Sequence, residues 1–290
     1  MAANNYLAVG RAIGAIQALH YSASRIPAEI LFEILDAALI ELNESKAQVT
    51  NDFVYDLEQI FDALQNRTEV PIFEIAKREY SYLPLFQYRD RPLTLYRVMA
   101  EEPQFYAGLL RDAFKPRNRE VPEPTEGQRG VARVAYRLLS EFRSVPGVVE
   151  SRVDPQVLES WVQEVRRLAK IEDRSEIGDE FIGHMLANAP FDEDGAWPHR
   201  AVRDLIEKLA SKELEVGIEV ERFNMRGPHA RAIYGGGEPE REIAQQIRAW
   251  TRKTLAWPRT TATLERLAES WELHGRQQDE RASQDKMRYE

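Results

Sequence analysis

The sequence predicts an all-α protein, an array of roughly a dozen helices that stack as antiparallel hairpins. Apolar residues recur at helical spacing over most of the 290 residues, and prolines or capping residues stand where these segments begin. Short stretches at 146–154 and 216–223 look extended, but neither has the neighbours that a sheet requires. Both an α-solenoid-like arrangement and a two-lobed bundle fit this pattern.

The N-terminal part begins with helices expected at 5–20, 27–42 and 51–65. Pro27 stands in the first turn of the second helix, where a missing N–H is tolerated, and Asn51 is the expected cap of the third. Both helices carry an apolar stripe, formed by Ile30, Leu31, Ile34, Leu35, Ala38, Leu39 and Leu42 and by Val54, Leu57, Ile60, Phe61 and Leu64. The same spacing predicts further helices at 71–83, 92–101, 103–114 and 125–143.

The C-terminal part is equally regular. Asp154 is the expected N-cap of a helix with Pro155 in its first turn. Asp173 and Glu176 have the D-x-x-E spacing of a capping box at the start of the next helix. Four more helices are expected at 198–211, 212–223, 238–255 and 258–285.

Composition divides the chain into two helical lobes. The segment at 116–128 is rich in proline and poor in apolar residues, so it is expected to be a linker or a long exposed loop. This places an N-terminal lobe at 1–115 and a C-terminal lobe at 129–275. Residues 276–290 lack apolar periodicity and are expected to form a polar tail.

The residue content argues against several classes of function. A net charge of −9 without a basic stripe disfavours nucleic-acid binding. The absence of cysteine removes thiolate–metal sites, disulfides and cysteine nucleophiles. No apolar run is long enough for a membrane helix and no secretion signal is evident, so a cytoplasmic location without membrane contact is expected. No catalytic, cofactor-binding or metal-binding motif stands out, and we predict no cofactor.

A glycine run at 235–237 looks at first like a phosphate-binding loop that opens a helix. It lacks the lysine and the hydroxyl of that motif, and it leads into Glu238, Pro239 and Glu240. Carboxylates in the first turn take the place that an anion would occupy. The run is therefore expected to be a flexible helix start that binds no nucleotide.

The loop at 224–237 is the most unusual segment, because it gathers positive side chains in an acidic protein. Arg226 and Arg231 are its best candidates for binding an acidic group on a protein partner, and their loss should change stability little. The full set of predicted partner-binding residues is Asn224, Arg226, His229, Arg231 and Tyr234, with Trp197 and Arg203 from a nearby turn.

Two long stretches carry a resemblance. "YSYLPLFQYRDRPLTLYRVMAEEPQFYAGLLRDAFKP" and "APFDEDGAWPHRAVRDLIE…FNMRGPHARAIYGGGEPEREIAQ" resemble the C-terminal helical region of large, multidomain, functionally uncharacterised bacterial proteins. The distinguishing positions would be Trp197, Pro198, Arg203, Asn224, Arg226 and Gly227. The resemblance implies one segment of a longer polypeptide and transfers no catalytic residue.

These observations favour a non-catalytic module for protein interaction or scaffolding, with protein partners that the sequence does not identify. A ligand- or nucleotide-responsive sensor domain that uses the 224–237 loop is the alternative. A helical enzyme with catalytic groups from distant positions is the third possibility.

Overall fold

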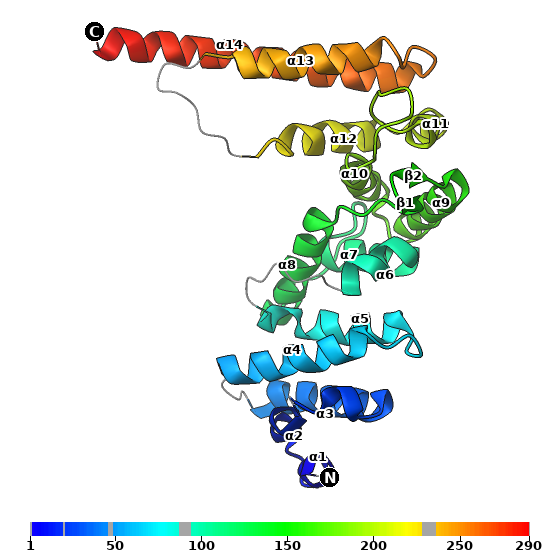
Figure 1. Cartoon of the computed structure of the whole chain (residues 1–290), viewed down its shortest axis with the longest axis vertical. Helices are drawn as coiled ribbons and strands as arrows, with labels where there is room; N and C mark the ends of the chain where they lie inside the picture. The colour runs from blue at the N-terminus through cyan, green and yellow to red at the C-terminus, as the bar shows by residue number, and fades with distance from the viewer. Residues whose placement is uncertain (1, 20, 46–48, 87–93, 228–235, 290) are drawn as a thin grey trace. The chain divides into compact units, whose positions relative to one another are not determined.

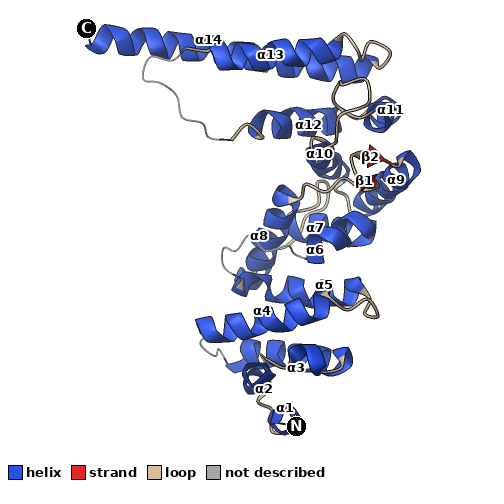
Figure 2. Cartoon of the chain, in the orientation of Figure 1, coloured by secondary structure: helices blue, strands red, loops and turns tan. Residues whose placement is uncertain are grey.

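The computed structural model describes the chain apart from residues 1, 20, 46–48, 87–93, 228–235 and 290. The predicted fold class is confirmed: the structure is 73% helical, and its described strands form one two-stranded sheet (Figure 2). Within the described residues, no helix is both long and apolar enough to cross a membrane.

The elements follow the order predicted from helical spacing (Figure 1). The helices are α1 (Ala2–Ala8), α2 (Ala12–Leu19), α3 (Ala28–Ser45), α4 (Asn51–Gln65), α5 (Ile72–Tyr82), α6 (Thr94–Glu101), α7 (Pro103–Ala113), α8 (Glu126–Glu141), α9 (Pro155–Ile171), α10 (Ser175–Leu186), α11 (Arg200–Leu209), α12 (Lys212–Asn224), α13 (Glu238–Thr251) and α14 (Pro258–Tyr289). Short 3₁₀ turns lie at Ala23–Arg25 and Leu83–Leu85, and the strands are β1 (Val148–Val149) and β2 (Arg152–Val153). The helix expected at 5–20 is divided at Gly10, which has a φ of 68°, and the stretch at 216–223 is helical.

The chain divides into two compact units, Met1–Met99 and Ala100–Glu290. Helix α7 belongs to the second unit, so this division falls earlier than the boundary expected at 116–128. Helix α14 continues to Tyr289, so the segment expected as a polar tail is helical.

The core of the first unit is formed by the apolar stripes predicted on α3 and α4. Leu31, Ile34, Leu35, Leu57 and Ile60 on these helices are all completely buried. The Tyr82 hydroxyl at the end of α5 donates a hydrogen bond to the Leu35 carbonyl oxygen at 2.6 Å. A buried tyrosine needs such a partner, and this bond also ties α5 to α3.

In the second unit, Tyr106 on α7 is the centre of an aromatic cluster. Its ring lies 4.9 Å from that of Trp161 on α9 and 5.7 Å from that of Phe142, which follows α8. Its hydroxyl donates to the Phe181 carbonyl oxygen on α10 at 3.1 Å. One side chain therefore connects four successive helical segments.

The N-cap predicted at Asp154 is confirmed. Its carboxylate accepts hydrogen bonds from two amides of the first turn of α9 at 2.9 and 3.2 Å. At α4 the cap is Thr50 and not Asn51. Thr50 lies in extended backbone, and its hydroxyl accepts from the Phe53 amide at 3.2 Å. Asn51 is already inside the helix.

The capping box predicted at Asp173 and Glu176 is wrong. Arg174 takes the N-cap position of α10, and Asp173 lies before it with a φ of 58°. The Asp173 carboxylate instead accepts from the backbone and side-chain amides of Asn118 at 2.6 and 2.7 Å, which lowers its pKa below the usual range. Glu176 pairs with Arg117. Partners that lie far away in the sequence have replaced the local cap.

The segment between α7 and α8 is thereby attached to the turn between α9 and α10. Arg119 adds a hydrogen bond to the Ile171 carbonyl oxygen at 3.0 Å. At its other end, Thr125 and Gln128 form a capping box for α8, with bonds of 2.8 and 3.3 Å. The segment expected as a linker is a docked loop of the second unit.

Glycines allow α10 and α12 to approach closely. A Cβ atom on Gly183 would lie 2.2 Å from the Leu214 carbonyl oxygen, and one on Gly217 would lie 2.1 Å from that of Glu180. Real side chains do not fit at such distances, so this crossing depends on both glycines.

We expect Gly217→Ala to destabilise the protein, because the added methyl group meets backbone that cannot move away. Overpacking of this kind costs about 1–3 kcal/mol, which corresponds to several degrees in Tm. Gly130→Ala on α8 is the matched control, since its Cβ would meet nothing closer than 4.0 Å. Equal melting temperatures for the two variants in thermal denaturation would contradict this account of the crossing.

Candidate functional site

The residues predicted to bind a partner have different fates in the structure. Trp197, Arg203 and Arg226 are used inside the protein, Asn224 is exposed, and His229, Arg231 and Tyr234 lie outside the described residues. Trp197, Arg203 and Arg226 stabilise the packing of this region, and Asn224 lines a groove.

Trp197 belongs to the core. Its indole N–H donates to the Ala189 carbonyl oxygen at 2.9 Å, and its ring packs against Trp250 of α13 at 6.1 Å. The Arg222 guanidinium from α12 lies over the same ring, 4.5 Å from its centroid. A side chain that is 1% exposed is not accessible to a partner, so we assign Trp197 a role in joining α12 and α13 to this turn.

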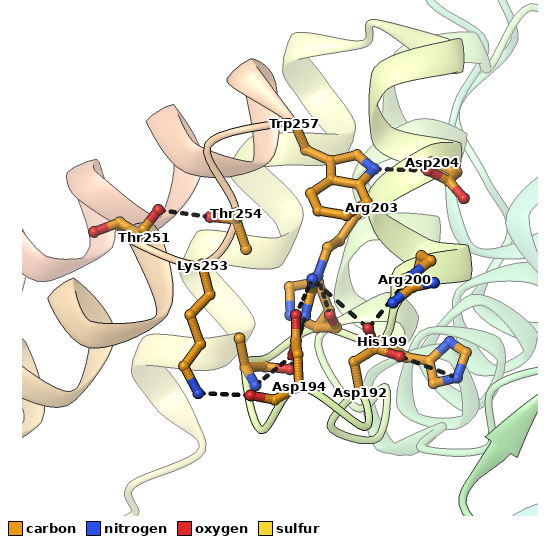
Figure 3. Close-up of polar contacts among 12 residues, drawn as sticks. Asp192, Asp194, His199, Arg200, Arg203, Asp204, Thr251, Lys253, Thr254 and Trp257 are labelled. Carbon is orange, nitrogen blue, oxygen red and sulfur yellow. Dashed lines mark hydrogen bonds and ion pairs between the residues drawn. The ribbon is translucent and has the colours of Figure 1, made fainter.

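Arg203 is completely buried, and its guanidinium is held by the turn that precedes α11 (Figure 3). Nη1 and Nη2 donate to the two carboxylate oxygens of Asp194 at 2.8 and 3.0 Å. Nε donates to the Pro198 carbonyl oxygen at 2.6 Å, and Nη2 also donates to that of Ala196 at 3.0 Å. This charge-assisted, bidentate pair fixes the turn and leaves Arg203 inaccessible from outside.

The sequence Ala-Trp-Pro occurs at 196–198 and again at 256–258, and the two copies meet at this point. Trp257 lies over the Arg203 guanidinium at 5.0 Å, and its indole N–H donates to Asp204 at 2.6 Å (Figure 3). Glu207 on α11 accepts from the Thr260 amide at 2.9 Å and so caps the start of α14. Arg203, Asp204 and Glu207 of α11 therefore position the start of α14, through one cation–π contact and two hydrogen bonds.

An Asp–His pair lies beside this cluster. Asp192 is 3.7 Å from His199 Nε2, 3.5 Å from Arg200 and 3.7 Å from Arg203. The other ring nitrogen of His199 accepts from the Ala201 amide at 3.2 Å. One imidazole nitrogen thus caps the start of α11 and the other faces Asp192, which favours a structural role for the pair over a catalytic one.

Arg226 is not the unpaired cation that the sequence suggested. It forms an ion pair with Glu240 on α13, whose side chain is 0% exposed, and its guanidinium lies 5.3 Å from the ring centroid of Trp271 on α14. Removing it would take the cation away from a buried carboxylate, which is costly. We therefore expect its loss to destabilise the protein, in contrast to the expectation from the sequence.

The described part of the glycine run packs against α14. A Cβ atom on Gly237 would lie 2.0 Å from the Gly275 carbonyl oxygen, so α13 begins in direct backbone contact with α14. The Gly237 amide donates to Asp279 at 2.7 Å, and Arg241 donates to the same carboxylate at 2.5 Å. A carboxylate from the chain itself thus occupies the position where a phosphate would meet the helix start.

Asn224 lines a groove between α12 and α14 with a volume of about 490 Å³. Its apolar lining consists of Val220, Phe223, Leu267 and Leu273, and its polar lining includes Asn224, Ser270 and Gln277. We call this the α12–α14 groove.

The α12–α14 groove exposes more aliphatic surface than a closed core would. Val220 is 42% exposed and Leu273 is 50% exposed, and Val216, one turn before Val220, is 39% exposed. The floor is rigid, because Phe223 stacks on Trp271 at 4.3 Å. Contiguous exposed apolar side chains at a groove are typical of interaction sites.

Sequence reasoning missed this groove. The stretch at 216–223 lies in the helix predicted at 212–223, and Val216 and Val220, four residues apart, share one face of it, but the sequence alone does not show that this face is exposed. Leu273 comes from α14, and its proximity to α12 depends on the tertiary fold.

Comparison with family models, with curated proteins and with solved structures finds no match to this chain. Among the described residues, no group of three or more histidine, aspartate and glutamate side chains is placed to hold a metal ion.

We expect Arg203→Met to destabilise the protein by about 3–5 kcal/mol, because it leaves the Asp194 and Asp192 carboxylates without their central cation. Arg200→Met is the matched control, since this exposed arginine contacts Asp192 only at 3.5 Å and its loss should cost about 0–1 kcal/mol. Urea denaturation of both variants gives the comparison. A small effect of Arg203→Met would mean that the pair does not hold the turn.

The pair also predicts a pH dependence. Hydrogen bonds from Arg203, above all, lower the pKa of Asp194 from 3.8 to about 2. A carboxyl group with a lowered pKa stabilises the fold above its unfolded pKa, and this contribution is lost as the pH falls towards the folded value. We therefore expect the difference in Tm between the wild type and Asp194→Asn to shrink between pH 3.8 and about 2. A difference that stays constant over this range would contradict the assignment.

Proposed function

We propose that this chain is a non-catalytic protein-interaction module that binds an amphipathic helix of a partner protein in the α12–α14 groove. The observation that carries the proposal is the exposure of Val220 and Leu273 in a groove between two helices, with the exposed Val216 one turn before Val220 on α12. A helix laid into such a groove would bury its apolar face against these side chains.

The charges beside the groove support recognition by apolar contact. Arg266 on α14 lies 2.6 Å from Glu219 and 3.0 Å from Glu215 of α12, and Arg259 lies 2.6 Å from Glu215, so two arginines balance the two carboxylates within the protein. The remaining polar groups of the lining are the amides of Asn224 and Gln277, the hydroxyl of Ser270 and the imidazole of His274. Such a rim suits the polar edge of an amphipathic helix and does not require a strongly charged partner.

The groove is also fixed in shape before any partner arrives. Helix α12 is attached to α10 at Gly217 and to α13 through the Arg226–Glu240 pair. Binding to such a preformed surface avoids the entropy cost of ordering it.

We infer that the module acts in the cytoplasm as one part of a larger bacterial protein, without contact with nucleic acid. The net charge of −9 and the resemblance of its helical stretches support this setting. The alternative, a sensor that uses the 224–237 loop, loses support because Arg226 and Gly237 are both engaged in helix packing.

A peptide-display selection tests the groove. We expect the wild-type protein to enrich peptides with apolar residues at i, i+3, i+4 and i+7 spacing, which become helical when bound. Leu273→Glu and Val220→Glu should weaken the enriched peptides at least tenfold in fluorescence anisotropy, because each places a charge on the apolar lining. Leu255→Glu is the matched control, since Leu255 is 70% exposed and does not line the groove.

Peptides that bind all the variants equally would place recognition elsewhere. A selection that enriches no helical peptide would remove the support for the proposed function.

A further inference from the structure

A second hollow lies in the same unit, between the end of α7, the docked loop that follows it and the start of α8. Its volume is about 520 Å³. Arg174, the N-cap residue of α10, contributes to its lining. We call it the Arg174 hollow, and none of its lining residues belongs to the α12–α14 groove.

Arg174 is a largely buried cation, and its guanidinium donates hydrogen bonds to backbone carbonyl oxygens. Its side chain is only 9% exposed. Nε donates to the Phe114 carbonyl oxygen at 2.8 Å, Nη1 to that of Glu172 at 2.5 Å and Nη2 to that of Arg111 at 3.1 Å. The nearest ion-pair contact is the Glu172 carboxylate at 3.8 Å. Because a guanidinium has five N–H donors, this geometry leaves donors for a ligand.

The surroundings reinforce the need for an anion. Burial lowers the pKa of Arg174 below its ordinary value, and the positive charges of Arg119 and Arg111 add to this effect, while Glu172 and Asp173 oppose it. A cation in this position gains more than an exposed one from a bound negative group.

The charged residues that line the hollow are mostly positive: Arg111, Lys115, Arg129 and Arg174, with Asp112 as the one carboxylate. Arg111 pairs with Asp112 at 3.2 Å and Lys115 pairs with Glu123 at 3.3 Å, so Arg129 and Arg174 carry the local excess of positive charge. Arg129 donates to the Pro124 carbonyl oxygen at 3.1 Å and forms no ion pair with the residues that the structure describes. A local excess of cations in a protein with a net charge of −9 favours an anionic ligand.

The rest of the lining is apolar. Val121 and Val131 are 42% and 46% exposed, and Pro122 and Pro124 also line the hollow. The hollow therefore places a hydrocarbon surface beside a set of guanidinium groups.

We propose that the Arg174 hollow binds a carboxylate carried on an apolar group. The carboxylate would meet the planar donors of Arg174 and Arg129, and the apolar part would cover Val121 and Val131. This combination favours a carboxylate over inorganic phosphate, because phosphate has no apolar part to bury and loses more hydration in such a site. The carboxylate could belong to a small organic acid or to the C-terminus of a peptide.

NMR titration of the full chain with matched probes tests the proposal. The small acid is 4-phenylbutyrate with 4-phenylbutyramide as its neutral counterpart, and the peptide is N-acetyl-Gly-Phe-Leu as the free acid and as the amide. We expect saturable shifts of the Gln128 and Val131 amides with at least one of the acids, and at least tenfold weaker binding of its amide. The acid that binds more tightly identifies the source of the carboxylate.

Two arginines on α8 provide a matched pair of variants. Arg129→Gln should weaken acid binding at least tenfold, whereas Arg133→Gln should change it less than twofold, because Arg133 does not line the hollow and pairs with Glu126 at 3.2 Å. Val131→Glu should abolish binding by placing a carboxylate in the hollow. Arg129 and Val131 are exposed, so these variants should keep the wild-type circular dichroism spectrum.

Several outcomes would overturn the proposal. These are the absence of saturable shifts with either acid, equal binding of acid and amide, equal effects of Arg129→Gln and Arg133→Gln, and binding of inorganic phosphate as tight as that of the acids. The same acids should bind unchanged to Leu273→Glu, so this test is independent of the proposed helix-binding function.

Discussion

The C-terminal half of the second unit depends on one buried ion pair. Arg203 has no exposed surface, so its charge must be balanced by neighbours, and Asp194 with the carbonyl groups of the preceding turn provides that balance. Trp257 covers the guanidinium, and Glu207, one turn further along α11, caps α14. The direction of α14, and hence the groove that it forms with α12, follows from this arrangement.

Close backbone contact complements the ion pair. Gly217 brings α12 against α10, and Gly237 brings the start of α13 against Gly275 of α14. Helices this close leave little room for large side chains at the crossing points. Val220, three residues after Gly217, and Leu273, two residues before Gly275, are both exposed. The same two helices thus combine close backbone contact at the glycines with exposed apolar side chains in the groove.

The sequence was sufficient to predict the helices because helical spacing is a local property. Leu35 and Ile60 were placed correctly in the core by their positions on an apolar stripe. Pairing between charged groups could not be predicted in this way. Arg226 pairs with Glu240, fourteen residues later in the chain. Asp173 does not cap α10, because its carboxylate accepts hydrogen bonds from Asn118, 55 residues earlier. Both interpretations failed because the deciding partner comes from another element.

The same limit explains why neither proposed binding surface was visible in the sequence. The α12–α14 groove brings Val220 of α12 together with Leu273 of α14. The Arg174 hollow brings Arg129 of α8 together with Arg174 at the start of α10. The two surfaces differ in physical character. The groove is apolar, with its neighbouring charges already paired, whereas the hollow combines cations with exposed valines. Screening by salt weakens attraction between exposed charges and leaves apolar burial largely intact. The two proposed sites therefore share no lining residue, and they would bind their ligands through different kinds of interaction.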